Sequence, residues 1–146
     1  MTIWIDADAC PVVGLAIAAA RRHTVECVLL CDTAHRMERD GARTIVVAKG
    51  ADSVDFALVN LVQPGDIAVT QDYGLAAMCL ARRAGVLNQN GLVYTNENIG
   101  ALLEQRHTSK KLRAAGIRTK GPSKRTAEQD DAFTDALEQL LSQLPK

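Results

Sequence analysis

Short runs of β-branched and apolar residues alternate along this chain with segments whose apolar residues recur at helical spacing. The run TVECVLLCD, at residues 24–32, is typical of a buried strand, whereas SVDFALVNLV, at 53–62, has apolar residues three and four apart. This alternation predicts an α/β fold, a three-layer sandwich whose central sheet is mostly parallel. We expect strands at residues 2–6, 24–32, 44–48, 67–70 and 91–95.

Helices are expected between and after these strands. Near the C-terminus, Thr126 and Gln129 have the spacing of a capping box, which predicts a helix over about 127–143. The side of this helix expected to pack on the domain carries Phe133, Leu137, Leu140, Leu141 and Leu144. The other helices are expected from Pro11 to about Arg22, over 53–62, from 71 to a stop at Gly85, and from about Asn96 to Ala115.

The length of 146 residues predicts one domain, residues 1–146, that is large enough to bury a core. Only five residues are aromatic, so the core is expected to consist of Ala, Val, Leu and Ile. No apolar run reaches the roughly 20 residues of a membrane helix, and the N-terminus lacks the layout of a signal peptide. We therefore expect a cytoplasmic protein that does not bind membranes. The four cysteines form no CxxC pair and are expected to be buried free thiols.

Carboxylates follow the ends of several expected strands. The motif IWIDADACP runs from an apolar strand into Asp6 and Asp8, and Asp32 and Asp72 follow later strands. The carboxyl ends of parallel strands meet at one edge of the sheet, where α/β proteins bind ligands. One carboxylate there can serve simply as a helix N-cap, which is the structural interpretation of Asp72. Two carboxylates one residue apart exceed what one cap needs, and their charges repel unless a cation lies between them.

Helix geometry selects a further carboxylate. At ~100° per residue, Asp55 lies at the border of the apolar face of the helix 53–62, from which it can turn toward the sheet edge. Asp52 lies on the opposite side and is expected to cap the helix or face water, and Asp66 precedes its strand, at the other end of the sheet. Hard cations prefer carboxylate oxygens as ligands. We therefore expect Mg²⁺ or Mn²⁺ to be held by the four proposed catalytic residues Asp6, Asp8, Asp55 and Asp72.

Positive charge is concentrated in one segment, although the net charge of the chain is zero. Residues 106–125, which are expected to include a basic loop, hold eight Lys and Arg and no Asp or Glu, whereas the rest holds nine basic and seventeen acidic residues. The segment is either a solvated surface or a binding site for the phosphate backbone of nucleic acid. Binding would be independent of sequence, because aromatic side chains for base stacking are scarce. The expected phosphate contacts are Lys110, Lys111, Lys120, Lys124 and Arg125.

The motifs IWIDADACP, GDIAVTQDYGLAA and GPSKRT together resemble those of the YaiI/YqxD family of bacterial proteins, over essentially the whole chain. That family is grouped with PIN-like domains, whose better-known members are Mg²⁺- or Mn²⁺-dependent ribonucleases. The resemblance implies that Asp6 is the acid ending the first strand, Asp55 the acid of the middle helix, and Asp72 the acid of an Asp-x-x-Leu-Ala signature. Asp8 belongs to the motif of this family and not to PIN-like domains generally. The last acid of many PIN-like sites would correspond to Asn96 or Glu97.

Three functions fit these residues. The leading hypothesis is a metal-dependent nuclease that hydrolyses phosphodiesters, with RNA favoured over DNA. The second is a phosphatase, because IDADAC resembles the Asp-x-Asp start of haloacid-dehalogenase-like enzymes. There Asp6 would attack phosphate and Asp8 would act as acid and base, while Asp66 and Asp72 would imitate the later acidic motif. The third is a non-catalytic nucleic-acid-binding module with a vestigial metal site.

Cys10 gives a weaker alternative. It precedes Pro11 at an expected helix start, where the helix dipole can lower the pKa of a thiol. A nucleophilic cysteine usually has a histidine as its base. The three histidines show no tie to Cys10 and no metal-ligand spacing, so we expect surface or structural roles for His23, His35 and His107.

Overall fold

Six strands form one sheet in the middle layer of the computed structural model, which describes residues 1–8, 10–50, 52–105 and 124–143. The strands are β1 (Thr2–Asp6), β2 (Glu26–Asp32), β3 (Arg43–Val47), β4 (Ile67–Val69), β5 (Gly85–Leu87) and β6 (Val93–Tyr94). Their order in the sheet is β3-β2-β1-β4-β5-β6. All neighbouring strands are parallel except β5 and β6, which are antiparallel. The predicted α/β class and the mostly parallel sheet are confirmed.

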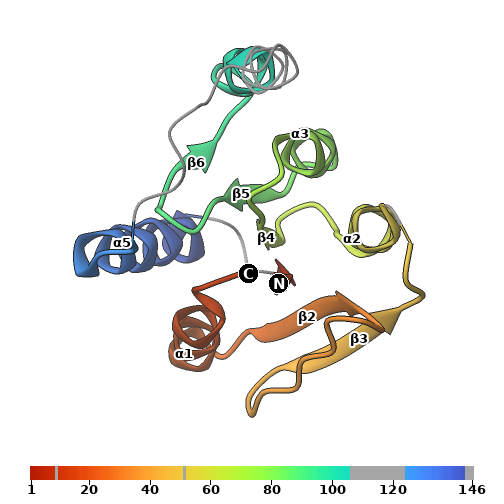
Figure 1. Ribbon diagram of the computed structural model, residues 1–146. Coiled ribbons are helices and arrows are strands. Elements are labelled where there is room, and N and C mark those ends of the chain that lie inside the picture. Colours follow the sequence, from red (N-terminus) through yellow and green to blue (C-terminus); the bar gives the residue numbers. More distant parts are fainter. Residues whose placement is uncertain (9, 51, 106–123, 144–146) are drawn as a thin grey trace.

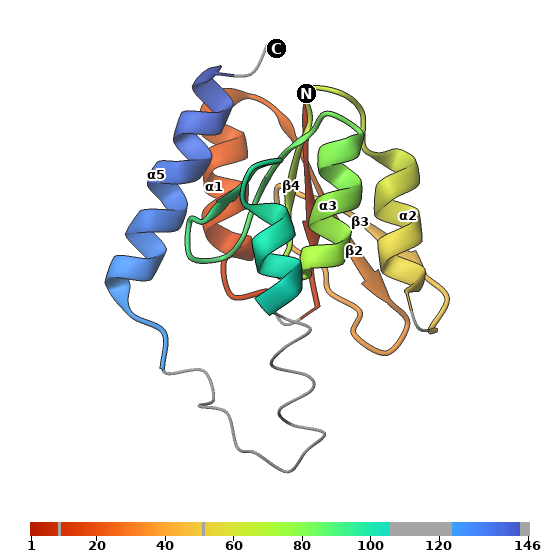
Figure 2. The same cartoon turned by 90° about the horizontal axis from the view of Figure 1, so that it is seen from above.

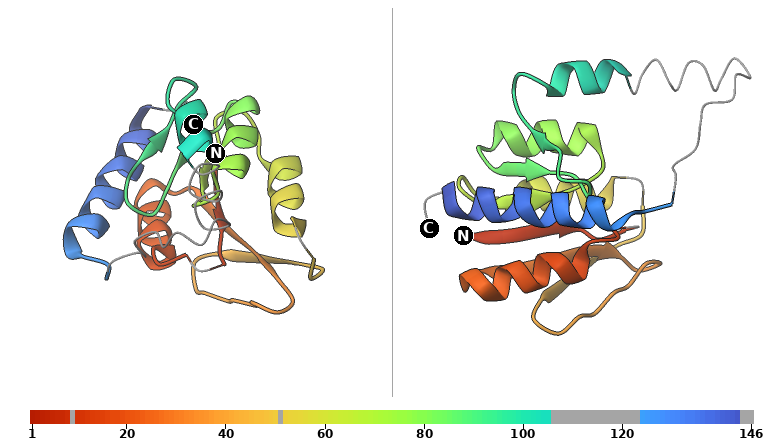
Figure 3. Two further views of the ribbon diagram at one scale, coloured as in Figure 1. Left: turned by 45° about the horizontal axis from the view of Figure 1, so that its top comes forward. Right: turned by 90° about the vertical axis from the view of Figure 1, so that its left-hand side faces the viewer.

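Helices cover both faces of this sheet (Figure 1). They are α1 (Val13–His23), α2 (Ser53–Leu61), α3 (Tyr73–Ala81), a helical segment over residues 99–105, and α5 (Ala127–Gln143). α1 and α5 pack on one face, while α2, α3 and residues 99–105 pack on the other. The two helical layers are seen side-on in Figure 2 and from two further directions in Figure 3. The chain thus forms the predicted three-layer sandwich.

The two central strands are apolar at successive positions because each of their faces meets a helical layer. In β1, Ile3 and Ile5 belong to the core formed with α1 and α5, whereas Trp4 belongs to the core formed with α2 and α3. β2 alternates in the same way, with Cys27, Leu29 and Cys31 on the first side and Val28 and Leu30 on the second. Strands that are buried on both faces have continuous apolar runs. This pattern made both strands predictable.

α5 begins with the predicted capping box. The amide of Thr126 donates to Oε1 of Gln129 at 2.9 Å, and the amide of Gln129 donates to the Thr126 hydroxyl at 3.3 Å. On the buried side of the helix, the side chains of Phe133, Leu137 and Leu141 are fully enclosed. The partner of α5 is α1, where Arg22 and His23 both pair with Glu138. Leu140 packs at the edge of this core, and Leu144 lies outside the described residues.

The structure corrects the prediction around Gly85. α3 ends at Ala81, and after a turn in which Arg83 adopts a φ of +66°, Gly85 begins strand β5. The prediction of one helix running to Gly85 was therefore wrong. β5 has three residues, which is too short for a periodic signal, and only its pairing with β4 identifies it as a strand.

The helix after β6 begins with a reciprocal cap. Thr95 and Asn98 exchange two hydrogen bonds, the Ile99 amide donates to the Thr95 carbonyl at 3.0 Å, and helix is described over residues 99–105, three residues past the predicted start at about Asn96. Residues 106–115 of the predicted helix lie outside the described part of the chain. None of the helices in that described part is both long and apolar enough to cross a membrane. All four cysteines are free thiols, and three of them are buried as predicted: Cys27, Cys31 and Cys79.

Candidate metal centre and phosphate site

The sheet has a topological switch point between β1 and β4. From β1 the chain continues into α1 on one face, and from β4 it continues into α3 on the other face. The two connections therefore diverge, and such divergence at the carboxyl ends of parallel strands is where α/β proteins place ligand sites. Asp6 is the last residue of β1, while Thr70 and Asp72 follow β4. The two predicted acids thus flank the switch point.

Thr70 joins the ends of these two strands. Its hydroxyl donates to Oδ2 of Asp6 at 3.0 Å and accepts from the amide of Asp72 at 3.1 Å. Its carbonyl accepts from the Tyr94 hydroxyl at 3.2 Å, and its amide donates to the carbonyl of Leu87. Thr70 is buried, and these hydrogen bonds satisfy all of its polar atoms within the protein. No sequence pattern indicated this role, because it arises only when β1 and β4 pair.

The Asp6 carboxyl group has a perturbed acidity. Burial raises its pKa to about 6, although the hydrogen bond from Thr70 acts in the opposite direction. The negative charges of Asp55, Asp72 and Asp8 raise this pKa further. The four predicted acids are thus near enough to interact electrostatically, and Asp6 is the member at which their repulsion converges.

Helix capping explains one of these acids and not the others. Asp72 is the N-cap of α3, where its Oδ1 accepts from the amides of Gly74 at 2.8 Å and Leu75 at 3.1 Å. The structural interpretation of Asp72 is therefore confirmed. α1, in contrast, begins after Val12 without a side-chain cap. Capping of that helix therefore does not account for Asp6 and Asp8.

A pocket of about 270 Å³ opens beside these acids, between α2 and the start of α3. Asp55 lines it from α2 and Asp72 lines it from α3, so the rotation inferred from helix geometry brings Asp55 to the site edge. Asp52 also lines the pocket, from the N-cap position of α2, where it makes no side-chain capping hydrogen bond. The remaining lining residues are Phe56, Gly74, Leu75 and Met78.

The chemistry of these acids favours a bound metal ion, whereas their arrangement does not form a complete metal site. Carboxylate oxygens are the donors that Mg²⁺ and Mn²⁺ prefer, and mutual repulsion between the acids favours a cation. Across the described residues, however, no three Asp, Glu, His or Cys side chains are grouped so that they could hold a metal ion. The donor set therefore fits a hard cation, while the described side chains do not form a complete protein cage.

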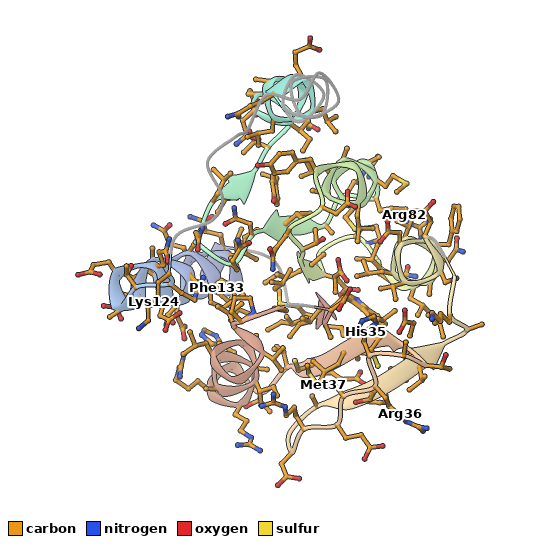
Figure 4. The ribbon with its side chains drawn as sticks, viewed as in Figure 1. His35, Arg36, Met37, Arg82, Lys124 and Phe133 are labelled. Atoms are coloured by element: carbon orange, nitrogen blue, oxygen red, sulfur yellow. The ribbon has the colours of Figure 1, made fainter. Side chains whose placement is uncertain are left out.

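His35 adds a contact that the sequence did not predict. Its Nδ1 lies 2.9 Å from Oδ1 of Asp32, and its Nε2 lies 3.8 Å from Oδ1 of Asp8. The hydrogen bond from His35 lowers the pKa of Asp32. In Figure 4, His35 lies close to the end of β1. His35 thus links two of the strand-end acids, and its three-residue separation from Asp32 was the only sequence signal for that link.

Asp66 lies at the opposite end of the sheet, as predicted. It is buried, and it accepts hydrogen bonds of 2.9 Å from the Trp4 indole and from the amides of Thr2 and Gln63. These contacts give Asp66 a structural role between the starts of β1 and β4. It therefore cannot supply the later acid that the phosphatase hypothesis requires near Asp6.

Cys10 lacks the features of an activated nucleophile. Burial raises the pKa of its thiol, which keeps the thiol protonated near neutral pH. His23, one of the possible bases, pairs with Glu138 on α5. His107 lies outside the described residues. The part of the chain that the structure describes therefore supports a packing role for Cys10.

The structure describes two of the predicted phosphate contacts. Lys124 is exposed just before α5, and Figure 4 shows it beside that helix. The Arg125 guanidinium is engaged within the protein, with Asp130 at 2.6 Å, Oδ1 of Asn90 at 2.8 Å and the carbonyl of Gln89 at 2.5 Å. Arg125 thus fastens the start of α5 to the β5–β6 loop. The other three predicted contacts lie outside the described residues: Lys110, Lys111 and Lys120.

Comparisons with known proteins point to one family. A family model described as "Uncharacterized BCR, YaiI/YqxD family" matches residues 4–143. A UPF0178 protein of Exiguobacterium sibiricum is 54% identical over 143 residues, which are 98% of each chain. UPF0178 proteins of Ruminiclostridium cellulolyticum (48% identical, 94% of this chain and 90% of that one) and Clostridium acetobutylicum (45%, 97% of each) are also similar. No solved structure matches the chain, so the grouping with PIN-like domains stays a prediction. On the extent and identity of these matches, the chain belongs to the YaiI/YqxD family.

Proposed function

We propose that the protein is a divalent-metal-dependent phosphodiesterase that cleaves nucleic acid, with RNA favoured over DNA. The observation that carries the proposal is the placement of Asp6, Asp8 and Asp72 at the carboxyl ends of β1 and β4 beside the switch point, next to a pocket that Asp55 and Asp72 line together. Asp6, Asp8, Asp55 and Asp72 would hold Mg²⁺ or Mn²⁺. When bound, such an ion supplies Lewis acidity toward phosphate oxygen and water.

An incomplete protein cage is compatible with this proposal. Mg²⁺ keeps several waters and is commonly bound by one or two carboxylates together with substrate phosphates. A site built from Asp6 and its neighbours therefore does not need three preformed protein ligands. The same reasoning predicts weak metal binding in the absence of substrate.

The residues of the chain itself would position the reaction. Thr70 holds Oδ2 of Asp6 at 3.0 Å, which fixes the carboxylate relative to Asp72. Lys124 and the other basic residues of 106–125 would contact the phosphate backbone without reading bases. On this proposal the protein recognises nucleic acid through charge, so its affinity for nucleic acid falls as the salt concentration rises.

Metal binding is tested first, by thermal unfolding in Mn²⁺ and in EDTA. A ligand at a hundredfold excess over its dissociation constant stabilises the folded state by about 2.7 kcal/mol. Asp72→Asn should remove most of this gain, and because Asn is a good N-cap the start of α3 should be preserved. Asp135→Asn on the exposed side of α5 is the matched control and should behave like the wild type. An equal Mn²⁺-dependent gain in Asp72→Asn would contradict the proposed site.

Cleavage is tested with labelled single-stranded RNA and DNA of mixed sequence. We expect Mn²⁺-dependent cleavage that is lost in EDTA, in Asp6→Asn and in Asp72→Asn, and retained in Asp135→Asn. Metal binding without cleavage of any RNA or DNA pool would contradict the nuclease. It would favour the second candidate, a nucleic-acid-binding module with a vestigial metal site, which is supported by the lack of a three-ligand group among the described residues.

A further inference from the structure

The chain has five aromatic residues, all in the described part, and packs four of them in or against its core. Trp4, Tyr94 and Phe133 are buried, and Tyr73 packs edge-to-face on Tyr94 with ring centroids 5.9 Å apart. Phe56, on α2, is 62% exposed. The one aromatic ring that faces solvent therefore directly follows Asp55 in the sequence.

Exposure of a single apolar residue has little meaning by itself, because folded proteins leave much apolar surface in contact with water. The position of Phe56 is what distinguishes it. Phe56 and Met78, which is 39% exposed, line the same pocket as Asp55 and Asp72. Two exposed apolar side chains from two different helices thus share a pocket with two of the proposed site acids.

We propose that this pocket is a nucleobase subsite, in which the ring of Phe56 stacks on an unpaired base and Met78 contacts the base alongside it. This inference rests on the proposed function and narrows its substrate to single-stranded nucleic acid. Stacking on aromatic side chains tolerates any base, since every base has a π face. A base inside a duplex is already stacked on its neighbours and would have to leave the helix to reach the pocket.

The charges of the pocket favour a base over a phosphate. Asp52, which is not one of the proposed metal ligands, repels an anionic group, whereas a neutral base experiences no such repulsion. The amino groups of adenine, cytosine and guanine are hydrogen-bond donors, and carboxylates accept hydrogen bonds from them. Asp52 is exposed and makes no side-chain capping bond, so it is suited to accept such a bond. The pocket therefore suits the base of a nucleotide, whereas the proposed Lys contacts would bind its phosphate.

The test is a binding cycle between one side chain and one chemical group of the ligand. Fluorescence anisotropy measures the affinity of a labelled eight-nucleotide single strand, and of the same strand in which abasic sites replace the bases, in EDTA so that cleavage cannot occur. The variants are Phe56→Ala, Phe56→Tyr and, as matched control, Leu61→Ala, which truncates a 38% exposed residue of α2 that does not line the pocket.

Stacking of one base on an aromatic ring is worth about 1–3 kcal/mol, so Phe56→Ala should weaken binding of the normal strand about 5- to 160-fold. The abasic strand should bind the wild type and Phe56→Ala equally, and Phe56→Tyr and Leu61→Ala should resemble the wild type. The inference is overturned if Phe56→Ala weakens binding of both strands equally or of neither, or if the wild type binds neither strand. The cleavage assay above is read separately: the expected cycle without any cleavage would retain the subsite and reject the nuclease.

Discussion

The hydroxyl of Thr70 donates a hydrogen bond of 3.0 Å to Oδ2 of Asp6, and this contact connects the carboxyl ends of β1 and β4. The same hydroxyl accepts from the amide of Asp72. One buried side chain thus fixes the relative positions of two proposed site acids that are 66 residues apart in the sequence. The hydrogen bond favours the charged form of Asp6, whereas burial favours the neutral form.

Replacing Thr70 by Val tests this link. Valine keeps the branched shape but leaves the Asp72 amide without its acceptor and Asp6 without its donor. We expect the free energy of unfolding to fall by about 1–3 kcal/mol, the typical cost of an unsatisfied buried polar group. The pKa of Asp6, followed by carboxyl NMR, should rise. Thr70→Ser keeps the hydroxyl and should retain the wild-type pKa; an unchanged pKa in Thr70→Val would contradict the role assigned to the hydroxyl.

The raised pKa of Asp6 predicts a pH dependence of stability in metal-free buffer. The folded state holds the Asp6 proton up to about pH 6, whereas the unfolded chain releases it near the ordinary pKa of 3.8. Between these values the folded state binds more protons, so stability should fall as pH rises from about 4 to 6. The contribution of Asp6 is at most roughly 3 kcal/mol at ~1.4 kcal/mol per pKa unit.

The matched variant for this pH dependence is Asp6→Asn, which cannot ionise. It should lack the Asp6 contribution to the slope between pH 4 and 6, and at pH 7 in EDTA it should be more stable than the wild type. Urea unfolding at several pH values measures both quantities. Parallel stability curves for the two proteins over this window would show that Asp6 does not titrate as described.

Lys124 and Arg125 should have separable effects. Lys124 is exposed, so Lys124→Ala should reduce the salt dependence of binding to single strands by ~0.7 log units per log unit of salt, with little change in stability. Arg125→Ala removes three contacts and should lower the free energy of unfolding by about 1–3 kcal/mol. Affinity over a range of salt and urea unfolding, applied to both variants, check this division. A wild-type salt slope in Lys124→Ala would favour the solvated-surface interpretation of the basic segment.

Gly91 should be intolerant of a side chain. Its φ is +84°, and an added Cβ would clash with the carbonyl oxygen of Ala132 on α5. Gly91→Ala should therefore push α5 away from the β5–β6 loop and cost several kcal/mol, since backbone strain alone costs about 1–3 kcal/mol. Gly100→Ala is the control, because a Cβ there meets nothing within 4 Å in a helical segment. It should be neutral or slightly stabilising by about 0.5–1 kcal/mol, and equal melting temperatures for the two variants would contradict the argument.

The features that sequence could predict are those encoded locally. The doubly buried runs of β1 and β2, the capping box of Thr126 and Gln129, and the rotation of Asp55 toward the site edge each depend on a few neighbouring residues. The features that were missed depend on pairing between distant segments. β5 is a strand only because β4 lies beside it, and Thr70 acquires its role only when β1 lies on the other side of β4.

The contacts of His35 could be predicted only in part from the sequence. Its separation of three residues from Asp32 is visible in the sequence, but its proximity to Asp8 depends on β1 and β2 being adjacent in the sheet. Likewise, Arg125 belongs to a basic segment by composition, yet its three hydrogen bonds in the fold involve Asp130 and the β5–β6 loop. Charge patterns therefore indicated which residue types are present and not which of them are already engaged.

The two edge strands of the sheet, β3 and β6, differ in how readily another chain could pair with them. β6 has only two residues, so it offers few unpaired backbone groups to a strand of another molecule. β3 has five residues, none of them buried, and its outer side pairs with no other described strand. Long, unpaired edge strands are where edge-to-edge self-association begins, and charged side chains on such strands oppose it. Arg43, which pairs with Glu26 of the adjacent strand β2, is the one charged residue of β3, so its loss would leave an uncharged strand at that edge of the sheet.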